Sequence, residues 1–233
     1  LENYRNYESL QLSFDKGTTI FYGDNAQGKT NILESIYLSS TTKSHKGSKD
    51  KDIIKFGAEE GHIRIILEKD GLDYRIDMHL RKSKSKGIAI NCERIKKASE
   101  LVGLLNVVLF SPEDLNIIKD GPAYRRRFVD MELCQLDQFY IYNLTNYNKI
   151  INNRNVLLKD LYYNPSLRET LTIWDTQLES YGSKIIERRA QFCEQLNEII
   201  YDIHQKGKND QTDQLGTDYG IIGTCEGEQG HLI

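Results

Sequence analysis

The sequence predicts an α/β fold in which a phosphate-binding lobe is followed by a helical lobe. Three features predict it: a glycine-rich loop at residues 23–30, alternating apolar residues at 62–69 and 72–80, and helical periodicity over 137–162 and 172–204. We expect the phosphate-binding lobe to span residues 1–120 and the helical lobe 121–205. Residues 206–233 are polar, acidic and rich in glycine, which predicts an atypical, poorly ordered tail.

The composition is that of a globular protein, because 39% of the 233 residues are hydrophobic and 28% are charged. No apolar run is long enough to span a bilayer, and the polar start lacks the hydrophobic region of a secretory signal. These features predict a cytoplasmic protein that does not bind membranes. The cysteines form no C-x-x-C pair, which argues against a zinc site and a disulfide framework. They are Cys92, Cys134, Cys193 and Cys225.

The glycine-rich loop fits the phosphate-binding pattern G-x-x-x-x-G-K-[ST] at every fixed position. Residues 18–22 before it are β-branched and aromatic, which predicts a buried strand, and residues 31–38 after it have apolar positions at helical spacing. Strand, loop and helix together predict a nucleotide site. The residues of the predicted site are Gly23, Asp24, Asn25, Ala26, Gln27, Gly28, Lys29 and Thr30.

The residue types of this loop suit phosphate chemistry. Gly23 and Gly28 permit backbone conformations that a β-carbon would block, so that successive N–H groups can point at phosphate oxygens. The helix that begins near Gly28 adds the positive end of its dipole. We expect Lys29 to reach the β- and γ-phosphates and the Thr30 hydroxyl to be a ligand of Mg²⁺.

The segment before the loop predicts two adjacent strands. Residues 10–14 alternate apolar and polar side chains like a strand with one solvated face, and residues 15–17 form a turn. Arg5 lies in the preceding polar stretch. It is a candidate auxiliary nucleotide contact, and a solvated turn arginine is an equally good interpretation of its spacing.

The alternating segments at 62–69 and 72–80 predict an antiparallel hairpin, because Asp70-Gly71 between them is a preferred pair for a tight turn. A hairpin at this place departs from the βαβ order, which favours an ABC-type ATPase over a G protein or a nucleotide kinase. Residues 104–110 are almost continuously apolar, which predicts a buried strand of the main sheet.

Pro112 opens one helix, and Gly121-Pro122 ends that helix and opens another at the start of the expected helical lobe. Arg125, Arg126 and Arg127 follow one another, and they could bind phosphate or hold acidic neighbours such as Asp130. The two long periodic stretches, separated by Asn164-Pro165-Ser166, predict an antiparallel helical hairpin with a seam close to that of a coiled coil.

Several segments resemble the bacterial RecF family of DNA repair and replication proteins. The stretch 110–130 is the most specific of them, although Asp120 stands where the family pattern has Gly. The resemblance covers residues 1–205. The other segments are Asn3-Tyr4-Arg5-Asn6-Tyr7, the loop with its flanks from Tyr22 to Glu34, Tyr147-Asn148-Lys149 and Trp174-Asp175-Thr176-Gln177-Leu178.

The resemblance implies an ATPase head of the ABC type, related to SMC proteins, that binds ATP and Mg²⁺ and dimerises on ATP. It implies binding of single- and double-stranded DNA at gaps and junctions, work with RecO and RecR in loading RecA, and a nucleoid-associated location. By resemblance, residues 23–30 form the ATP site and Arg5 is an auxiliary contact. A weak DNA-dependent ATPase activity is implied for the intact family.

The sequence departs from the family pattern in its last part. We find neither an apolar strand that ends in Asp-Glu nor a Ser-Gly signature helix after residue 205. We therefore expect an incomplete ATPase head, a truncated form that holds phosphate without efficient hydrolysis. Two alternatives stay open: another P-loop enzyme such as a nucleotide kinase, and an SMC-like structural head that works through its helical arm.

Overall fold

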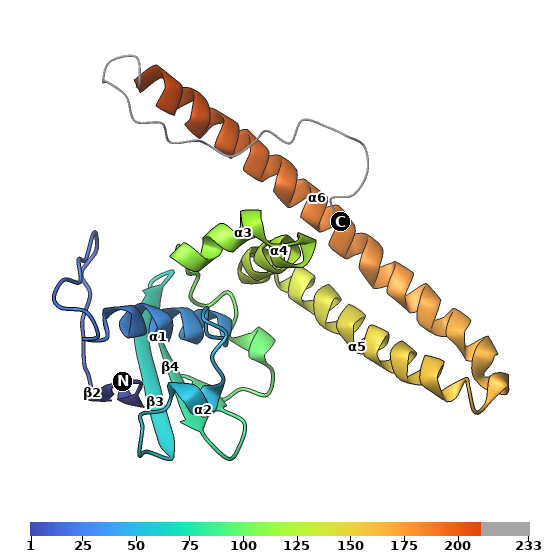
Figure 1. The fold of residues 1–233 in the computed structure, drawn as a ribbon, viewed down its shortest axis with the longest axis horizontal. Helices are drawn as coiled ribbons and strands as arrows, with labels where there is room; N and C mark the ends of the chain where they lie inside the picture. The colour runs from blue at the N-terminus through green and yellow to red at the C-terminus, as the bar shows by residue number, and fades with distance from the viewer. Residues whose placement is uncertain (211–233) are drawn as a thin grey trace. The chain divides into compact units, whose positions relative to one another are not determined.

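The computed structural model describes residues 1–210, which form two compact units (Figure 1). The first unit comprises Leu1–Pro112 with Cys134–Gln138, and the described part of the second comprises Glu113–Leu133 and residues 139–210. The boundary expected between residues 120 and 121 thus lies at Pro112 in this division. The expected tail begins inside a helix that runs to Asp210, and the rest of it, 211–233, lies outside the described residues.

The first unit contains an antiparallel sheet of six strands in the order β2-β1-β3-β4-β5-β6. Each strand pairs antiparallel with its neighbours. The strands β3 to β6 pair in chain order, whereas β1 pairs with β2 and also, at Glu2↔His62, with the distant β3. The strands are β1 (Glu2–Tyr4), β2 (Tyr7–Ser9), β3 (Glu60–Lys69), β4 (Leu72–Arg81), β5 (Gly87–Ile90) and β6 (Glu93–Arg94).

The predicted hairpin is confirmed as β3 and β4, which pair without a break from Glu60↔Arg81 to Lys69↔Leu72. Asp70 and Gly71 have φ angles of 53° and 74°. Two successive positive φ angles are typical of the tight hairpin turn whose twist matches that of the strands. The turn therefore fixes which residues of the two strands face one another.

The core of the first unit lies between one face of this sheet and two helices, α1 (Lys29–Thr41) and α2 (Asp50–Ile53). Figure 1 shows α1 crossing β3 and β4. The alternation predicted for the hairpin is the reason for this core, since every second residue of β3 and β4 points to the same face. The buried apolar residues are Tyr4, Leu38, Ile53, Ile54, Ile63, Ile76, Met78, Leu80 and Leu101.

Three strand predictions are wrong. Residues 10–14, 18–22 and 104–110 have no strand conformation, and they leave large apolar side chains exposed, among them Ile20, Tyr22, Val108 and Phe110. An isolated bridge between Val102 and Leu105 is the one β contact of the third segment in the part described. A strand needs a neighbouring strand to satisfy its backbone groups. None of the six strands described pairs with these segments, so their apolar pattern alone does not make them strands.

The chain enters the second unit through short helical elements, η2 (Pro112–Leu115) and α3 (Asn116–Lys119), and continues in α4 (Pro122–Leu136). The predicted roles of the two prolines are confirmed. Each is the first residue of its element, where the missing N–H group costs no hydrogen bond within the helix. A further short element, η1 (Ala98–Glu100), belongs to the first unit.

The second unit is dominated by α5 (Gln138–Asp160) and α6 (Leu171–Asp210), joined through η3 (Pro165–Thr170). They run antiparallel and meet at η3 (Figure 1). Arg154 Nε donates to Asp175 Oδ1 at 2.6 Å near the η3 end, and Arg189 Nε donates to Tyr140 Oη at 2.9 Å farther along. The predicted helical hairpin is therefore confirmed.

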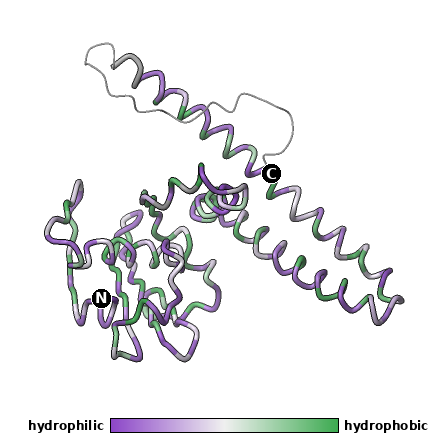
Figure 2. The backbone as a smooth tube through the Cα atoms, in the orientation of Figure 1, coloured by the Kyte–Doolittle hydropathy of each residue, from purple (hydrophilic) through white to green (hydrophobic). Residues whose placement is uncertain are grey.

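The seam of this hairpin follows the predicted periodicity over most of α6. Ile185 is buried at 3% exposure, whereas Ile199 and Ile203 near the end of α6 are 57% and 64% exposed. Figure 2 shows hydrophilic and hydrophobic residues alternating along both helices. No helix among residues 1–210 is long and apolar enough to cross a membrane.

Candidate nucleotide site

The glycine-rich loop is an exposed turn that leads directly into α1. Gly23, Ala26 and Gly28 have φ angles of 133°, 67° and 97°. Gly28 is the N-cap of α1, and its carbonyl oxygen accepts a hydrogen bond from the Asn31 N–H group at 2.8 Å. The loop thus ends where the first N–H groups of the helix have no partner inside the helix, which is the arrangement that binds anions.

Lys29, the first residue of α1, folds its side chain back over the loop. Its Nζ group donates to the carbonyl oxygens of Gly23 at 2.8 Å and Asp24 at 2.6 Å. An ammonium group carries three donors and can exchange neutral carbonyl partners for charged phosphate oxygens, which form stronger hydrogen bonds. Thr30 follows on an exposed position at the start of the helix. The structure therefore brings the predicted loop residues together at one helix end.

Two residues that the sequence analysis did not identify hold the end of the loop. Asn6 Nδ2 and Tyr7 Oη each donate to the carbonyl oxygen of Gln27 at 3.1 Å, and Asn31 Nδ2 donates to Asn6 Oδ1 at 2.9 Å. A β-carbon at Gly28 would lie 2.6 Å from Tyr7 Oη. A side chain at position 28 would thus displace the ends of the Asn6 and Tyr7 side chains, and the positive φ angle favours glycine there. Sequence spacing gave no signal for this contact.

Arg5, in the turn between β1 and β2, is bound to α1 by a buried carboxylate. Its Nε group donates to Glu34 Oε2 at 2.8 Å and its Nη2 group to Glu34 Oε1 at 2.6 Å. Two further donors bond to Ser48 Oγ at 2.8 Å and to the Asp52 carbonyl oxygen at 3.0 Å. The Arg5 side chain is only 20% exposed, so the solvated-turn interpretation is wrong. A nucleotide contact by Arg5 stays a prediction.

The charge of Glu34 is stabilised in spite of its burial. Burial raises the pKa of Glu34, but hydrogen bonds from Arg5 and Ser44 outweigh it and bring this pKa below the usual range. Ser44 Oγ donates to Glu34 Oε1 at 2.6 Å. The hydrogen bonds that Arg5 donates to Glu34 raise the pKa of Arg5, so both groups stay charged. The pair therefore fixes α1, and with it the loop, against the edge of the sheet.

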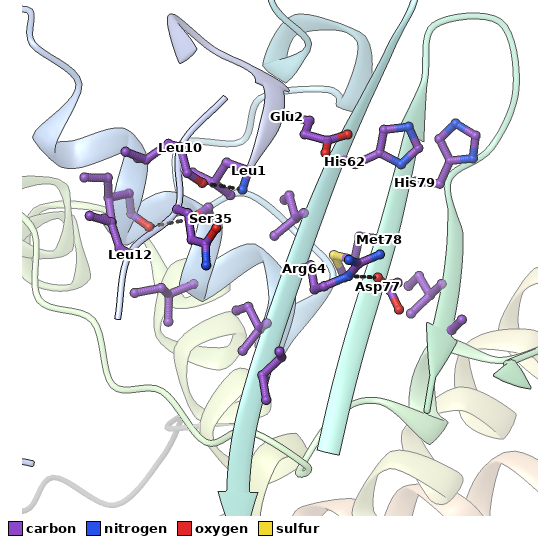
Figure 3. Close-up of a pocket in the computed structure, with 18 of the residues that line it drawn as sticks. Leu1, Glu2, Leu10, Leu12, Ser35, His62, Arg64, Asp77, Met78 and His79 are labelled. Carbon is purple, nitrogen blue, oxygen red and sulfur yellow. Dashed lines mark hydrogen bonds and ion pairs between the residues drawn. The ribbon is translucent and has the colours of Figure 1, made fainter. Parts of the chain in front are cut away.

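A cavity of about 1290 Å³ lies beside the sheet, apart from residues 23–30. Its lining includes Leu10, Leu12, Ser35, His62 and His79 (Figure 3). Residues 10–14 thus line an open space instead of forming the predicted strand. The phosphate loop is a surface site of its own.

Arg125 of α4 has structural contacts in the second unit. Arg125 Nη1 donates to the carbonyl oxygens of Ile117 at 3.3 Å and Asp120 at 3.2 Å, which caps α3. Asp130 accepts from Nη2 of Arg189 at 2.8 Å and 3.0 Å and from the hydroxyl of Tyr140. Burial, followed by the hydrogen bond to Asp130, raises the pKa of Tyr140 above its usual value.

The chain is similar to several known proteins. The family model described as AAA domain matches residues 1–216.

The chain belongs to the AAA domain family.

Among curated proteins similar to this AAA domain are the DNA replication and repair protein RecF of Agathobacter rectalis, 65% identical over 204 residues, and that of Lachnospira eligens, 60% identical over 208 residues. Each alignment covers 88% of this chain, and the chain spans only 56% and 57% of those two proteins. The resemblance to RecF is therefore confirmed.

Two solved structures of the recombination mediator protein RecF are also similar to this AAA domain. One was determined with ATP and has a TM-score of 0.80, and the other has a TM-score of 0.77. Both are 37% identical in sequence and cover 84% of this chain, which spans 52% and 53% of theirs. The predicted α/β fold of the ABC-type ATPase head is confirmed by this likeness.

Proposed function

We propose that this AAA domain binds ATP with Mg²⁺ at residues 23–30. The observation that carries the proposal is the position of Lys29, whose ammonium group lies on the carbonyl oxygens of Gly23 and Asp24 at the N-terminus of α1. The loop N–H groups and Lys29 would hold the phosphates, and the Thr30 hydroxyl would hold Mg²⁺. The metal ion would neutralise phosphate charge when bound. A RecF structure with the same fold was determined with ATP, which supports this assignment.

The same likeness supports a role in DNA replication and recombinational repair. The relatives are named for DNA replication and repair, and the similar solved structures are described as a recombination mediator of the RecFOR pathway. We infer that this chain takes part in binding DNA at gaps and junctions and in ATP-dependent dimerisation. We also infer that it helps to load RecA together with RecO and RecR, near the nucleoid in the cytoplasm. It spans 56–58% of its curated relatives, so these activities are proposed for the whole protein.

Binding of a fluorescent ATP analogue with Mg²⁺ tests the site. Lys29→Ala removes a charge-assisted contact of about 1.5–3 kcal/mol, so we expect the dissociation constant to rise roughly 10- to 100-fold. Lys16→Ala is the matched control, since Lys16 is an exposed lysine of the preceding turn. Equal affinities of the two variants for the analogue would refute the role of Lys29.

Filter binding with gapped DNA tests the DNA role. We expect gapped DNA to bind more tightly with ATP than without it, and the difference to disappear in Lys29→Ala. An affinity for gapped DNA that does not respond to ATP, measured with a full-length relative as well, would contradict the RecF-like function.

A further inference from the structure

A second group of functional side chains lies on the sheet, away from the phosphate loop. Glu60 and His62 come from β3 and His79 from β4, and one ligand atom of each lies within 4.8 Å of the others. His62 and His79 are directly opposite one another in the hairpin. Their rings stack with centroids 4.3 Å apart and planes 20° apart. We propose that Glu60, His62 and His79 form a binding site for a divalent transition-metal ion of the zinc class.

The donor set fits this class of ion. Two imidazole nitrogens and one carboxylate oxygen are ligands that suit zinc and its neighbours, whereas Mg²⁺ and Ca²⁺ prefer oxygen alone. His79 Nε2 lies 2.7 Å from Glu60 Oε2, and the ionised carboxylate can only accept, so the nitrogen carries the proton. An ion would take the place of that proton. With metal–ligand bonds of about 2.0–2.2 Å, the two atoms would separate to roughly 3.4 Å in a tetrahedral site.

The backbone under the site is rigid and the side chains are accessible. β3 and β4 pair along their full length, so the positions of His62 and His79 are fixed by the sheet. The side chains of His79 and Glu60 are 36% and 52% exposed, which leaves room for the small rotations that bring the ligand atoms together. Figure 3 shows His62 and His79 side by side on the cavity described above. Water in that cavity can complete the coordination.

A further carboxylate lies on the same face of the sheet. Glu2 of β1 pairs with His62, and Figure 3 shows its carboxylate beside that ring. Arg81 is the cation opposite Glu60 in the register, and its Nη2 group is bound to the Ser85 carbonyl oxygen at 2.9 Å. On the same face, the guanidinium groups of Arg64 and Arg75 are both bound to the Asp77 carboxylate, which leaves Glu2 and Glu60 as the carboxylates beside the two histidines. An ion here would tie β3 to β4, and Glu2 would extend the link to β1.

Isothermal titration of the chelator-treated, untagged chain with Zn²⁺ tests the proposal. We expect one equivalent to bind, and His62→Ala, His79→Ala and Glu60→Gln each to weaken that binding at least tenfold. His204→Ala is the matched control, because His204 lies on α6 in the other unit, and it should bind as the unchanged chain does. Mg²⁺ should not compete. Absence of one-equivalent binding, or unchanged affinity in the three site variants, overturns the proposal.

Titration with Co²⁺ separates this site from adventitious binding at cysteine. A histidine and carboxylate site gives only weak visible bands, whereas exposed thiolates such as that of Cys92 would add an intense near-ultraviolet sulfur-to-metal band. Appearance of that band at one equivalent overturns the assignment. Circular dichroism without metal checks that the variants are folded. The metal site does not rest on the nucleotide proposal, and His79→Ala is expected to keep the affinity for the ATP analogue.

Discussion

The guanidinium group of Arg5 and the carboxylate of Glu34 form a two-point ion pair, with 2.8 Å from Nε to Oε2 and 2.6 Å from Nη2 to Oε1. Glu34 is completely buried. The pair joins the turn between β1 and β2 to the helix that carries the phosphate loop. The stability of the nucleotide site therefore depends on a residue outside the loop.

Removing Arg5 should destabilise the first unit strongly. Arg5→Ala leaves the Glu34 carboxylate buried without its partner, which costs about 3–5 kcal/mol in comparable cases. Urea unfolding followed by circular dichroism measures the change. Lys55→Ala is the control, because its pair with Glu8 is 3.5 Å long and Glu8 is 87% exposed. If Arg5→Ala were as stable as Lys55→Ala, the structural role of the pair would be disproved.

The same pair should give the protein a dependence of stability on pH. The pKa of Glu34 is lowered in the folded state, so its contribution is complete above the unfolded pKa of about 4.3 and is lost as the pH falls through the folded pKa. We expect the unfolding free energies of the unchanged chain and Glu34→Gln to differ most above pH about 4.3. Their difference should shrink at lower pH. A difference that grows with acidity would contradict this prediction.

Gly28→Ala should impair the nucleotide site by two effects. The added β-carbon would lie 2.6 Å from Tyr7 Oη and 2.7 Å from Asn6 Oδ1, and the φ angle of 97° is unfavourable for alanine. Strain alone costs about 1–2 kcal/mol. We expect at least a tenfold loss of ATP-analogue affinity together with a lower melting temperature.

Gly47→Ala is the matched control for that substitution. Gly47 also has a positive φ angle, 71°, but nothing lies within 4 Å of its added β-carbon. Backbone strain should therefore lower the melting temperature of Gly47→Ala, whereas its affinity for the ATP analogue should be unchanged. Equal losses of affinity in the two variants would show that the close approach of Asn6 and Tyr7 to position 28 does not affect binding of the ATP analogue.

Two ion pairs of the helical unit differ in burial. Arg189 of α6 pairs with Asp130 of α4, and Arg154 of α5 pairs with Asp175 of α6. Arg189 bonds to both oxygens of Asp130 with side chains 22% and 23% exposed, whereas Asp175, the partner of Arg154, is 52% exposed. Arg189→Ala should cost roughly 1.5–3 kcal/mol. Arg154→Ala should cost about 0–1 kcal/mol. Thermal unfolding compares them, and a larger loss for Arg154→Ala would reverse this ranking.

Local sequence patterns predicted the parts of the fold that depend on neighbouring residues. Asp70-Gly71 predicted the turn, and the alternation on either side predicted which faces of β3 and β4 are buried. The positions of His62 and His79 could have been paired in the same way, since they lie equally far from that turn. The apolar alternation identifies only the buried face of the hairpin, so it gives no sign of the two histidines that pair on the polar face.

Long-range contacts could not be predicted in this way. The pattern of residues 18–22 and 104–110 predicts strands. A strand is defined by a hydrogen-bonded neighbour, however, and no strand among residues 1–210 pairs with these two segments. The pairing of Arg5 with Glu34 could not be predicted from the sequence either. Its partner Glu34 and its acceptors near residues 48 and 52 are far away in sequence, and no local spacing identifies them.

The sequence by itself determined the phosphate loop, the hairpin, the helical pair and the likeness to RecF, because each depends on residues close together in the chain. Only the tertiary structure decided that Asn6 and Tyr7 hold the loop, that Arg5 neutralises Glu34, and that Glu60 joins two stacked histidines. The physical reason is that hydrogen bonds and ion pairs depend on distance in space, which folding sets independently of distance along the chain.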